Sequence, residues 1–310
     1  MNFTLRVLGT ASAKPVPDRH QSAQVLSVRG RLFLIDCGEA VQRQLLRYHI
    51  PLMKIDSVFL SHIHGDHLFG LFPLLSTMGM QARTAPLNIY APANFGPVLK
   101  FFLSYFGEGL SFEIRHTPLQ MKRPECIYHT KNLEISAFPL DHKIDTFGFL
   151  FREKEPPYNV RKMCISQYGL SLTEIGTLKR GEDVVREDGT VIPVSEASYK
   201  PYVPRSYAYC SDTAAFPGLV EWVRGVTLLY HEATYTEEYA DQAAKRHHST
   251  AAQAARCALD AGVGKLLIGH FSSRVRDAAL YQAEAQALFP DTVAVNDGDL
   301  FDLPLIQPDR

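Results

Sequence analysis

The chain has 310 residues, 46% hydrophobic and 21% charged, enough to bury a sizeable core as one large domain or two ordinary ones. A formal net charge of −1 argues against a generic polyanion binder, whose non-specific affinity depends on a cationic surface. The five cysteines are scattered and form no C-x-x-C pair, which favours reduced thiols in a cytoplasmic protein over a disulfide framework.

Strand patterns dominate the first part of the chain. Apolar residues alternate or cluster and then stop at glycine in three successive segments, at 3–10, 23–30 and 31–38. Further strands are predicted at 54–62, 87–92, 133–142 and 146–153, and amphipathic helices at 39–50 and 68–83. Arg6 interrupts the first apolar stretch, so we expect no signal peptide, and no segment approaches the roughly 18 apolar residues of a membrane span.

Residues 152–200 differ from their neighbours in being polar, rich in turns and dense in charge. We interpret them as an insertion within a single domain that spans 1–310. Beyond the insertion, strands are predicted at 206–212, 225–233, 265–270 and 292–298, and helices at 248–262 and 276–290. Strands followed by helices in both halves predict an α/β (α+β) fold, with two sheets packed face to face in a four-layer αββα sandwich.

Three of the 12 histidines fall in one hexapeptide, HIHGDH, directly after an apolar strand. Alternate side chains of an extended chain point the same way, so His62 and His64 can converge on one ion. Gly65 lets the backbone turn, so that Asp66 and His67 can face a different point. Imidazole with carboxylate is a ligand set that suits zinc.

Ligand-type residues also follow three other predicted strands, namely His142, Asp212 and His270. One loop with four ligands cannot close two metal sites, so partners must come from other strand ends. The sequence therefore predicts a metal centre assembled from several strand ends.

These motifs carry a resemblance to a known family. LSHIHGDH, LDH, SDT and GHF resemble the successive motifs of the metallo-β-lactamase superfamily, with Asp36 in LIDCGE as the first. HEAT at 231–234, HST at 248–250 and GHFSSR at 269–274 are similar to the motifs of ribonuclease Z, the family of tRNA 3′-processing endonucleases. Together the motifs cover nearly the whole chain.

The resemblance implies a site for two zinc ions per subunit, with Mn²⁺ or another divalent ion as the alternative. The implied ligands are His62, His64 and His142 for one ion, Asp66, His67 and His270 for the other, and Asp212 as the bridge. Asp36 would fix the HIHGDH loop by hydrogen bonds.

The implied reaction is attack of a metal-bridging hydroxide on the phosphorus between the tRNA 3′ end and its trailer. It leaves a 3′-hydroxyl on the tRNA and a 5′-phosphate on the trailer. Asp66 would orient the nucleophile, and His248, oriented by Glu232, is the candidate general acid. The alternative for His248 is that it caps the following helix; His247 has the weaker claim, and His231 is equally well structural.

Four residues near the motifs are candidates for binding substrate phosphates. Ser249 and Thr250 lie at a predicted helix N-terminus, and Ser273 and Arg274 follow the last motif. The insertion at 152–200 corresponds to a flexible arm that grips tRNA in this family, and Lys179 and Arg180 are its candidate contacts. Because its eight basic residues are balanced by eight acidic ones, a solvated loop of mixed charge is the alternative.

The sequence departs from the family pattern in the loop PVPDRH at 15–20, where the family has P-x-K-x-R-N. Discrimination against CCA-bearing tRNA therefore stays open. The resemblance also implies a homodimer, for which LFGLFPLLSTMGM is either an interface or an internal core helix. The rival functions are another hydrolase of the same fold, such as an arylsulfatase or a small phosphodiesterase, and a non-catalytic RNA-binding scaffold. A β-lactamase is disfavoured, because Asp212 stands where such enzymes typically carry a cysteine.

Overall fold

The computed structural model describes residues 2–308 and divides the chain into two compact units. The larger unit comprises the chain up to residue 128, residues 135–151 and residues 206–303. The smaller unit comprises 129–134, 152–205 and the segment from 304 onward. Within 2–308, every helix is too short or too polar to cross a bilayer.

The first sheet of the larger unit has seven strands in the order β18-β1-β2-β3-β4-β5-β6. Their bounds are β1 (Phe3–Gly9), β2 (Ala23–Val28), β3 (Arg31–Ile35), β4 (Ile55–Phe59), β5 (Leu87–Pro92), β6 (Ile114–Leu119) and β18 (Leu300–Asp302). Strands β18 to β3 pair antiparallel, and β3 to β6 pair parallel. Parallel neighbours need crossover connections. These contain α1 (Val41–Arg47), η1 (Leu52–Lys54), α2 (Gly65–Leu68), α3 (Leu71–Met80) and α4 (Phe95–Phe106).

The second sheet also has seven strands, in the order β17-β16-β15-β14-β9-β8-β7. Their bounds are β7 (Glu125–His129), β8 (Leu133–Pro139), β9 (Phe147–Glu153), β14 (Ser206–Cys210), β15 (Leu228–Glu232), β16 (Leu266–Gly269) and β17 (Thr292–Ala294). Strands β14 to β17 are parallel. The helical segments between or after them are α8 (Pro217–Trp222), η2 (Glu237–Tyr239), α9 (Ala240–Arg246), α10 (Ala251–Ala261) and α11 (Ala278–Gln286).

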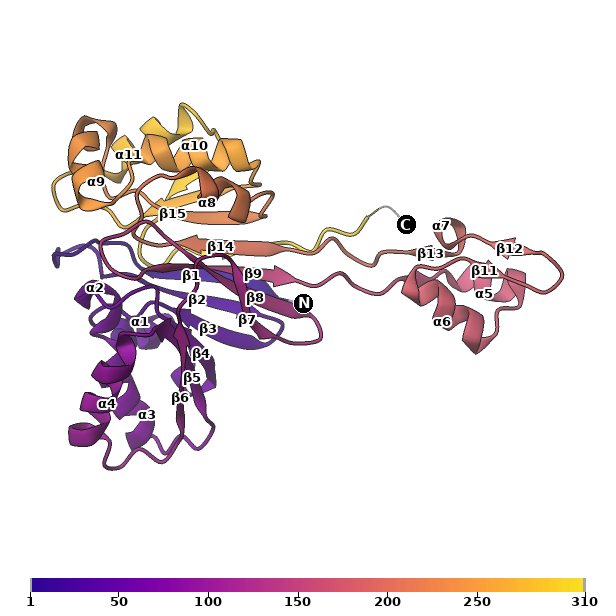
Figure 1. Cartoon of the computed structure of the whole chain (residues 1–310), viewed down its shortest axis with the longest axis horizontal. Helices are drawn as coiled ribbons and strands as arrows, with labels where there is room; N and C mark the ends of the chain where they lie inside the picture. The colour runs from indigo at the N-terminus through magenta and orange to yellow at the C-terminus, as the bar shows by residue number, and fades with distance from the viewer. Residues whose placement is uncertain (1, 309–310) are drawn as a thin grey trace. The chain divides into compact units, whose positions relative to one another are not determined.

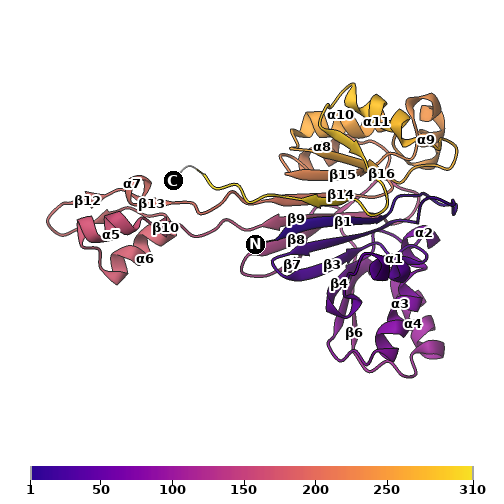
Figure 2. The same ribbon diagram turned by 180° about the vertical axis from the view of Figure 1, so that it is seen from behind.

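Aromatic side chains fill the space between the two sheets. The ring of Phe59 on β4 lies 5.3 Å from Phe149 and 5.2 Å from Phe151, both on β9. The residues on either side of Phe59, Val58 on β4 and Leu60 just after it, join the core beneath the helices instead, as the alternation of an extended chain requires. Helices α3 and α4 cover the outer face of one sheet, and α10 and α11 cover the other (Figures 1 and 2). The four-layer αββα sandwich predicted from the sequence is confirmed.

The smaller unit has a hydrophobic core of its own. It contains α5 (Lys162–Tyr168), α6 (Leu172–Arg180), α7 (Val194–Ala197) and two short hairpins, β10 (Asn159–Val160) with β13 (Ser198–Tyr199) and β11 (Val184–Val185) with β12 (Val191–Ile192). Its buried apolar residues are Cys164, Leu170, Leu178, Val184, Ile192 and Ala197. A buried ion pair between Arg205 Nε and Glu153 Oε2, 2.9 Å long, joins the two strands that lead into and out of this unit. Although residues 152–200 are polar in composition, they fold around a hydrophobic core of their own.

Several elements lie outside the sequence prediction, among them α4, α8, α9, β6 and β7. Strand β6 has the sequence IRHTPL, whose only large aliphatic residues stand at its two ends, so the apolar alternation that a strand prediction needs is missing. The helix predicted at 68–83 was wrong in extent, since α2 and α3 are separate there. The strand at 292–298 is also shorter than predicted, and β18 follows it and pairs with β1.

Candidate metal centre

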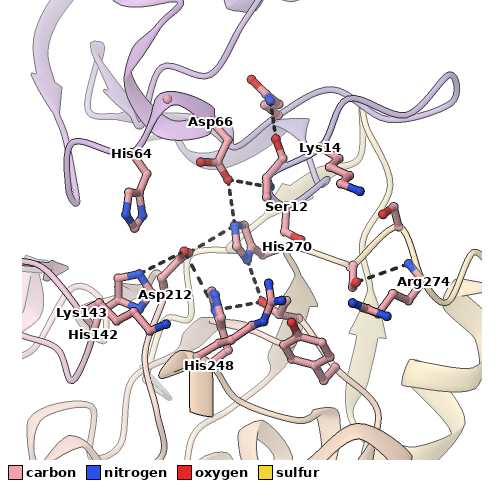
Figure 3. Close-up of a pocket in the computed structure, with 18 of the residues that line it drawn as sticks. Ser12, Lys14, His64, Asp66, His142, Lys143, Asp212, His248, His270 and Arg274 are labelled. Carbon is pink, nitrogen blue, oxygen red and sulfur yellow. Dashed lines mark hydrogen bonds and ion pairs between the residues drawn. The ribbon is translucent and has the colours of Figure 1, made fainter. Parts of the chain in front are cut away.

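The predicted metal ligands come together at the carboxyl ends of strands from both sheets (Figure 3). They are His62, His64, Asp66 and His67 after β4, His142 after β8, Asp212 after β14 and His270 after β16. The carboxyl ends of parallel strands are where side chains from different segments can converge on a ligand.

One group of ligand atoms comes from His62, His64, His142 and Asp212, all within 4.8 Å of one another. His62 Nε2 lies 2.9 Å from His64 Nδ1 and 3.6 Å from Asp212 Oδ2. His142 Nε2 is 3.9 Å from the same carboxylate oxygen. Burial lowers the pKa of each of these three histidines, which keeps them in the neutral form that binds a metal ion.

A second group comes from Asp66, His67 and His270. The Nε2 atoms of the two histidines are 3.2 Å apart, and each lies 3.5 Å from Asp66 Oδ2. Asp212 Oδ1 completes this group, at 3.4 Å from His67 Nε2 and 3.2 Å from His270 Nε2. The two oxygens of Asp212 therefore face different groups.

The hydrogen bonds of the histidines leave lone pairs directed at both centres. His142 Nδ1 donates to the carbonyl of His247 at 2.8 Å, while its buried Nε2 has no hydrogen-bond partner. His67 Nδ1 donates to Asp36 at 2.7 Å, and His270 Nδ1 donates to the hydroxyl of Thr234 at 2.8 Å. The facing Nε2 atoms then both present lone pairs, an arrangement that a shared cation stabilises. The donor set thus fits two divalent ions.

Asp36 makes the hydrogen bonds expected of it. The buried carboxylate accepts from the amide of Ser61 at 2.7 Å, from His67 Nδ1 at 2.7 Å and from the hydroxyl of Tyr209 at 2.6 Å. Its backbone has φ 54°, in the left-handed region that non-glycine residues seldom adopt. This strained residue fixes both the HIHGDH loop and the ring orientation of His67.

His248 and Glu232 form the pair that the sequence predicted. His248 Nδ1 lies 2.8 Å from Glu232 Oε1, and the histidine lines the same pocket as the ligands. Burial lowers the pKa of His248, but the attraction and hydrogen bond of Glu232 outweigh it and raise the pKa to about 9. The fully buried Glu232 is held by the amides of Thr213 at 3.0 Å and Thr234 at 2.8 Å.

Four other candidates have structural partners. Ser249 and Thr250 are fully buried; the Ser249 hydroxyl donates to the carbonyl of Thr213, and Thr250 is the N-cap of α10 in a capping box with Gln253. Neither residue lines the pocket over the candidate metal ligands. His231 is buried, with Nδ1 at 2.7 Å from the Glu232 carbonyl. His247 Nδ1 lies 2.9 Å from Asp141 Oδ1.

The pocket over the two ligand groups has a volume of about 1030 Å³ and a basic rim. Ser273 and Arg274 line it, as predicted, together with three cations that the sequence analysis did not select, Lys14, Lys143 and Arg246. In Figure 3, Lys14 and Arg274 lie on the side of His270, and Lys143 lies beside His142. Only the fold brings these cations together, because they come from widely separated segments.

The two candidate residues of the arm lie in the smaller unit and differ in their surroundings. Arg180 is paired with Glu182, with Nη2 at 2.9 Å from Oε2. Lys179 lines a depression together with Arg161 and Lys162. Of the two candidates, Lys179 is the one whose charge is not offset by an adjacent carboxylate in the part of the chain described.

Comparison with solved structures defines the fold. Human tRNase Z, short form, matches with a TM-score of 0.70 at 24% identity, over 97% of this chain and 99% of that chain. A metallo-β-lactamase fold protein from Bacillus subtilis matches with a TM-score of 0.68 at 19% identity, over 97% and 100%. A family model described as "Anti-Pycsar protein Apyc1" matches residues 3–154. The larger unit has the metallo-β-lactamase fold and carries a cluster of histidine and aspartate side chains that could hold metal ions.

Sequence comparison defines the family. Ribonuclease Z of Cytophaga hutchinsonii is 43% identical over 302 residues, 97% of this chain and 96% of that protein. Ribonuclease Z of Bacteroides thetaiotaomicron is 40% identical over 291 residues, 94% of this chain and 92% of that protein. The chain belongs to the ribonuclease Z family.

Proposed function

We propose that this chain is an endoribonuclease that removes the 3′ trailer from precursor tRNA, at a centre that holds two zinc ions. The observation that carries the proposal is the position of Asp212, whose two oxygens lie 3.6 Å from His62 Nε2 and 3.2 Å from His270 Nε2. A carboxylate shared by two histidine groups could bridge two metal ions, and such a pair would stabilise both the attacking and the leaving oxygen of a phosphodiester. Membership of the ribonuclease Z family supports precursor tRNA as the substrate.

The residues that line the pocket have different roles in the cleavage reaction. Bound zinc ions would supply Lewis acidity, which favours ionisation of water near neutral pH and neutralises phosphate charge. His248 donates a proton to the departing 3′ oxygen, and Glu232 holds the ring in the required orientation and favours its protonated form. Arg274 and Lys14 attract phosphate oxygens at the rim. The products are a tRNA with a 3′-hydroxyl and a trailer with a 5′-phosphate.

The direct test is incubation of the metal-replete protein with a 3′-extended precursor tRNA, followed by mapping of the cut and identification of the new ends. Elemental analysis should give about two zinc per chain, and Asp212→Ala should lose both metal and cleavage. Comparing substrates with and without an encoded CCA shows whether the departure at Pro17 and His20 affects discrimination. An uncut precursor together with turnover of an aryl sulfate or a small phosphodiester would favour the rival hydrolases.

We also infer a homodimer. The alternative interface helix α3 buries Leu71, Leu74, Leu75 and Met78 in the internal core, so it is a core helix. The neighbouring α4 instead exposes Phe101 (62%) and Tyr105 (70%) with ring centroids 4.9 Å apart. An apolar face of this kind is typical of a protein–protein contact. Sedimentation should give twice the chain mass, and Phe101→Lys should give the single-chain mass with the fold intact.

A further inference from the structure

Phe69 is an exposed aromatic side chain beside the metal ligands. It follows α2 directly and is 63% exposed, although phenylalanine is among the residues most often buried. It lines the same pocket as His64 and Asp66. The exposed aromatic residues of α4 do not line this pocket.

The ring of Phe69 is held against the peptide that carries the ligands. A Cβ on Gly65 would lie 2.4 Å from Phe69 Cε2 and 2.7 Å from Cδ2, so any larger residue at 65 would require the ring to move away. The Phe69 amide also donates to the Gly65 carbonyl at 2.9 Å. The glycine between His64 and Asp66 therefore leaves room for the ring to lie against this peptide, where it lines the pocket.

The basic rim alone cannot set the register of an RNA strand. Lys14, Lys143, Arg246 and Arg274 attract phosphates, and every nucleotide presents the same phosphate. An aromatic face adds what the cations lack, because an unpaired base stacks on it at a defined distance from the next phosphate. The nucleotides that flank a trailer junction lie beyond the paired acceptor stem and so have bases free to stack.

We propose that Phe69 is a positioning residue, whose ring stacks on the unpaired base next to the scissile phosphate. The inference rests on the proposed function and names the group that aligns the substrate strand over the two ligand groups. The stacked base is one of the two that flank the cut. A single stacking contact of this kind changes kcat/KM by about 5- to 150-fold.

The stacking role of Phe69 is tested by measuring the cleavage of three substrates by wild type and two variants. Phe69→Leu keeps an apolar side chain without an aromatic face, and Phe69→Trp keeps the face. The substrates are a 3′-extended precursor tRNA and two versions of it with an abasic nucleotide on either side of the cut. We expect Phe69→Leu to lower kcat/KM about 5- to 150-fold on the intact precursor, mainly through KM, with a scattered cut site. Phe69→Trp should restore both rate and register.

The abasic substrates separate stacking from a structural effect. With the stacked base removed, wild type and Phe69→Leu should cut at similar rates; an equal deficit of Phe69→Leu on all three substrates overturns the proposal. Zinc content, melting temperature and sedimentation are measured for each variant, and a loss of zinc or of the dimer in Phe69→Leu overturns it as well. Failure of the wild type to cut any precursor contradicts the proposed function instead, so the two failures are distinguishable.

Discussion

At the scale of single residues, the hydroxyl of Thr234 links the metal centre to the candidate acid. It donates to Glu232 Oε2 at 2.8 Å, so its only proton is used there. Its lone pairs face His270 Nδ1 at 2.8 Å and His248 Nδ1 at 3.2 Å. This oxygen therefore accepts from His270 Nδ1 and fixes the tautomer of that candidate ligand, and it also contacts His248, whose Nδ1 proton is directed at Glu232.

Replacing Thr234 tests this link. Thr234→Val keeps the shape and removes the hydroxyl, so His270 loses its acceptor and Glu232 loses a donor. We expect a 10- to 100-fold loss of zinc affinity or of kcat. Thr234→Ser keeps the oxygen and should stay close to wild type in both measurements; a Val variant as active as the Ser variant would contradict the role of the hydroxyl.

His248 should act without holding metal. Its Nδ1 is engaged by Glu232 at 2.8 Å and lies 4.0 Å from Asp212 Oδ2. We expect His248→Ala to bind zinc as wild type does and to lower kcat on precursor tRNA by about 10²–10⁴-fold. Metal analysis and single-turnover rates check this, and a variant that loses zinc together with activity would make His248 a ligand.

The clustering of the candidate ligands was predictable at this scale, because their residue types and spacing are typical of a metal site. The roles of Thr234 and of the His247 carbonyl were not predictable. The HEAT motif contains Thr234, but only the bend after β15 brings its hydroxyl 2.8 Å from His270. The carbonyl that orients His142 belongs to the backbone, and every residue has one. The sequence suggested phosphate binding for Ser249 and Thr250, whereas burial shows that their polar atoms serve the fold.

At the scale of elements, the N-terminus of α10 shows how a helix start can be mistaken for an anion site. The Thr250 hydroxyl accepts from the backbone amide of Gln253 and donates to Glu237 at 2.8 Å. The side-chain oxygen of Gln253 in turn accepts from the backbone amide of Thr250. The orphan N–H groups of the first turn are thereby satisfied from within the chain. A phosphate would have to displace these bonds.

Substituting the cap distinguishes the two roles. Thr250→Ala should lower the free energy of unfolding by about 1 kcal/mol and leave KM for precursor tRNA unchanged. Thr250→Ser should retain most of the stability. Chemical denaturation and steady-state kinetics check this, and a raised KM without loss of stability would instead support phosphate binding at this helix.

The smaller unit depends on a small core, which makes it sensitive to a single substitution. Leu178 on α6 is fully buried in that core, whereas Leu172 on the same helix is 88% exposed. Leu178→Ala should destabilise the unit by about 2–5 kcal/mol and weaken precursor binding, while hydrolysis of a small phosphodiester persists. Leu172→Ala is the matched control and should bind as wild type does. Equal loss of both activities in Leu178→Ala would contradict a tRNA-gripping role for the unit.

The shift in composition over 152–200 set apart the central segment of this unit, but it indicated neither 129–134, nor the segment from 304 onward, nor the helices. The α6 segment is polar overall, and its capping box, Ser171 with Glu174, is the one strong local sign of a helix. Short two-residue strands such as β10 and β13 have no periodicity to detect. The long apolar strands of the larger unit have buried alternating faces, and these were predicted correctly.

At the scale of the whole molecule, ligands come from both sheets of the larger unit. His62, His64 and His67 follow a strand of the first sheet, and Asp212 and His270 follow strands of the second. Zinc ions bound between them would bind the folded state and not the unfolded one, and would hold the sheets together at this end. The architecture was predictable because both halves repeat strand and helix; which strands face each other across the site was not.

Removing the metal should therefore cost stability as well as activity. Dialysis against a chelator should lower the melting temperature, since a ligand at about 1,000 times its Kd stabilises by about 4 kcal/mol. Zinc should restore both the melting temperature and the cleavage rate. Asp212→Ala, which is expected to bind no zinc, is the control, and its melting temperature should not respond to chelator or zinc.

The 203-residue separation of His67 from His270, whose ring nitrogens lie 3.2 Å apart, has a consequence for biosynthesis. The ribosome synthesises the HIHGDH loop long before it reaches β16. During most of translation the histidines of this loop therefore lack His270, the partner that completes the second ligand group. Cutting activity is then withheld until His270 has been translated and its strand has docked. Nascent chains halted before that point should be inert toward RNA, which protects a cell's transcripts from half-made nuclease.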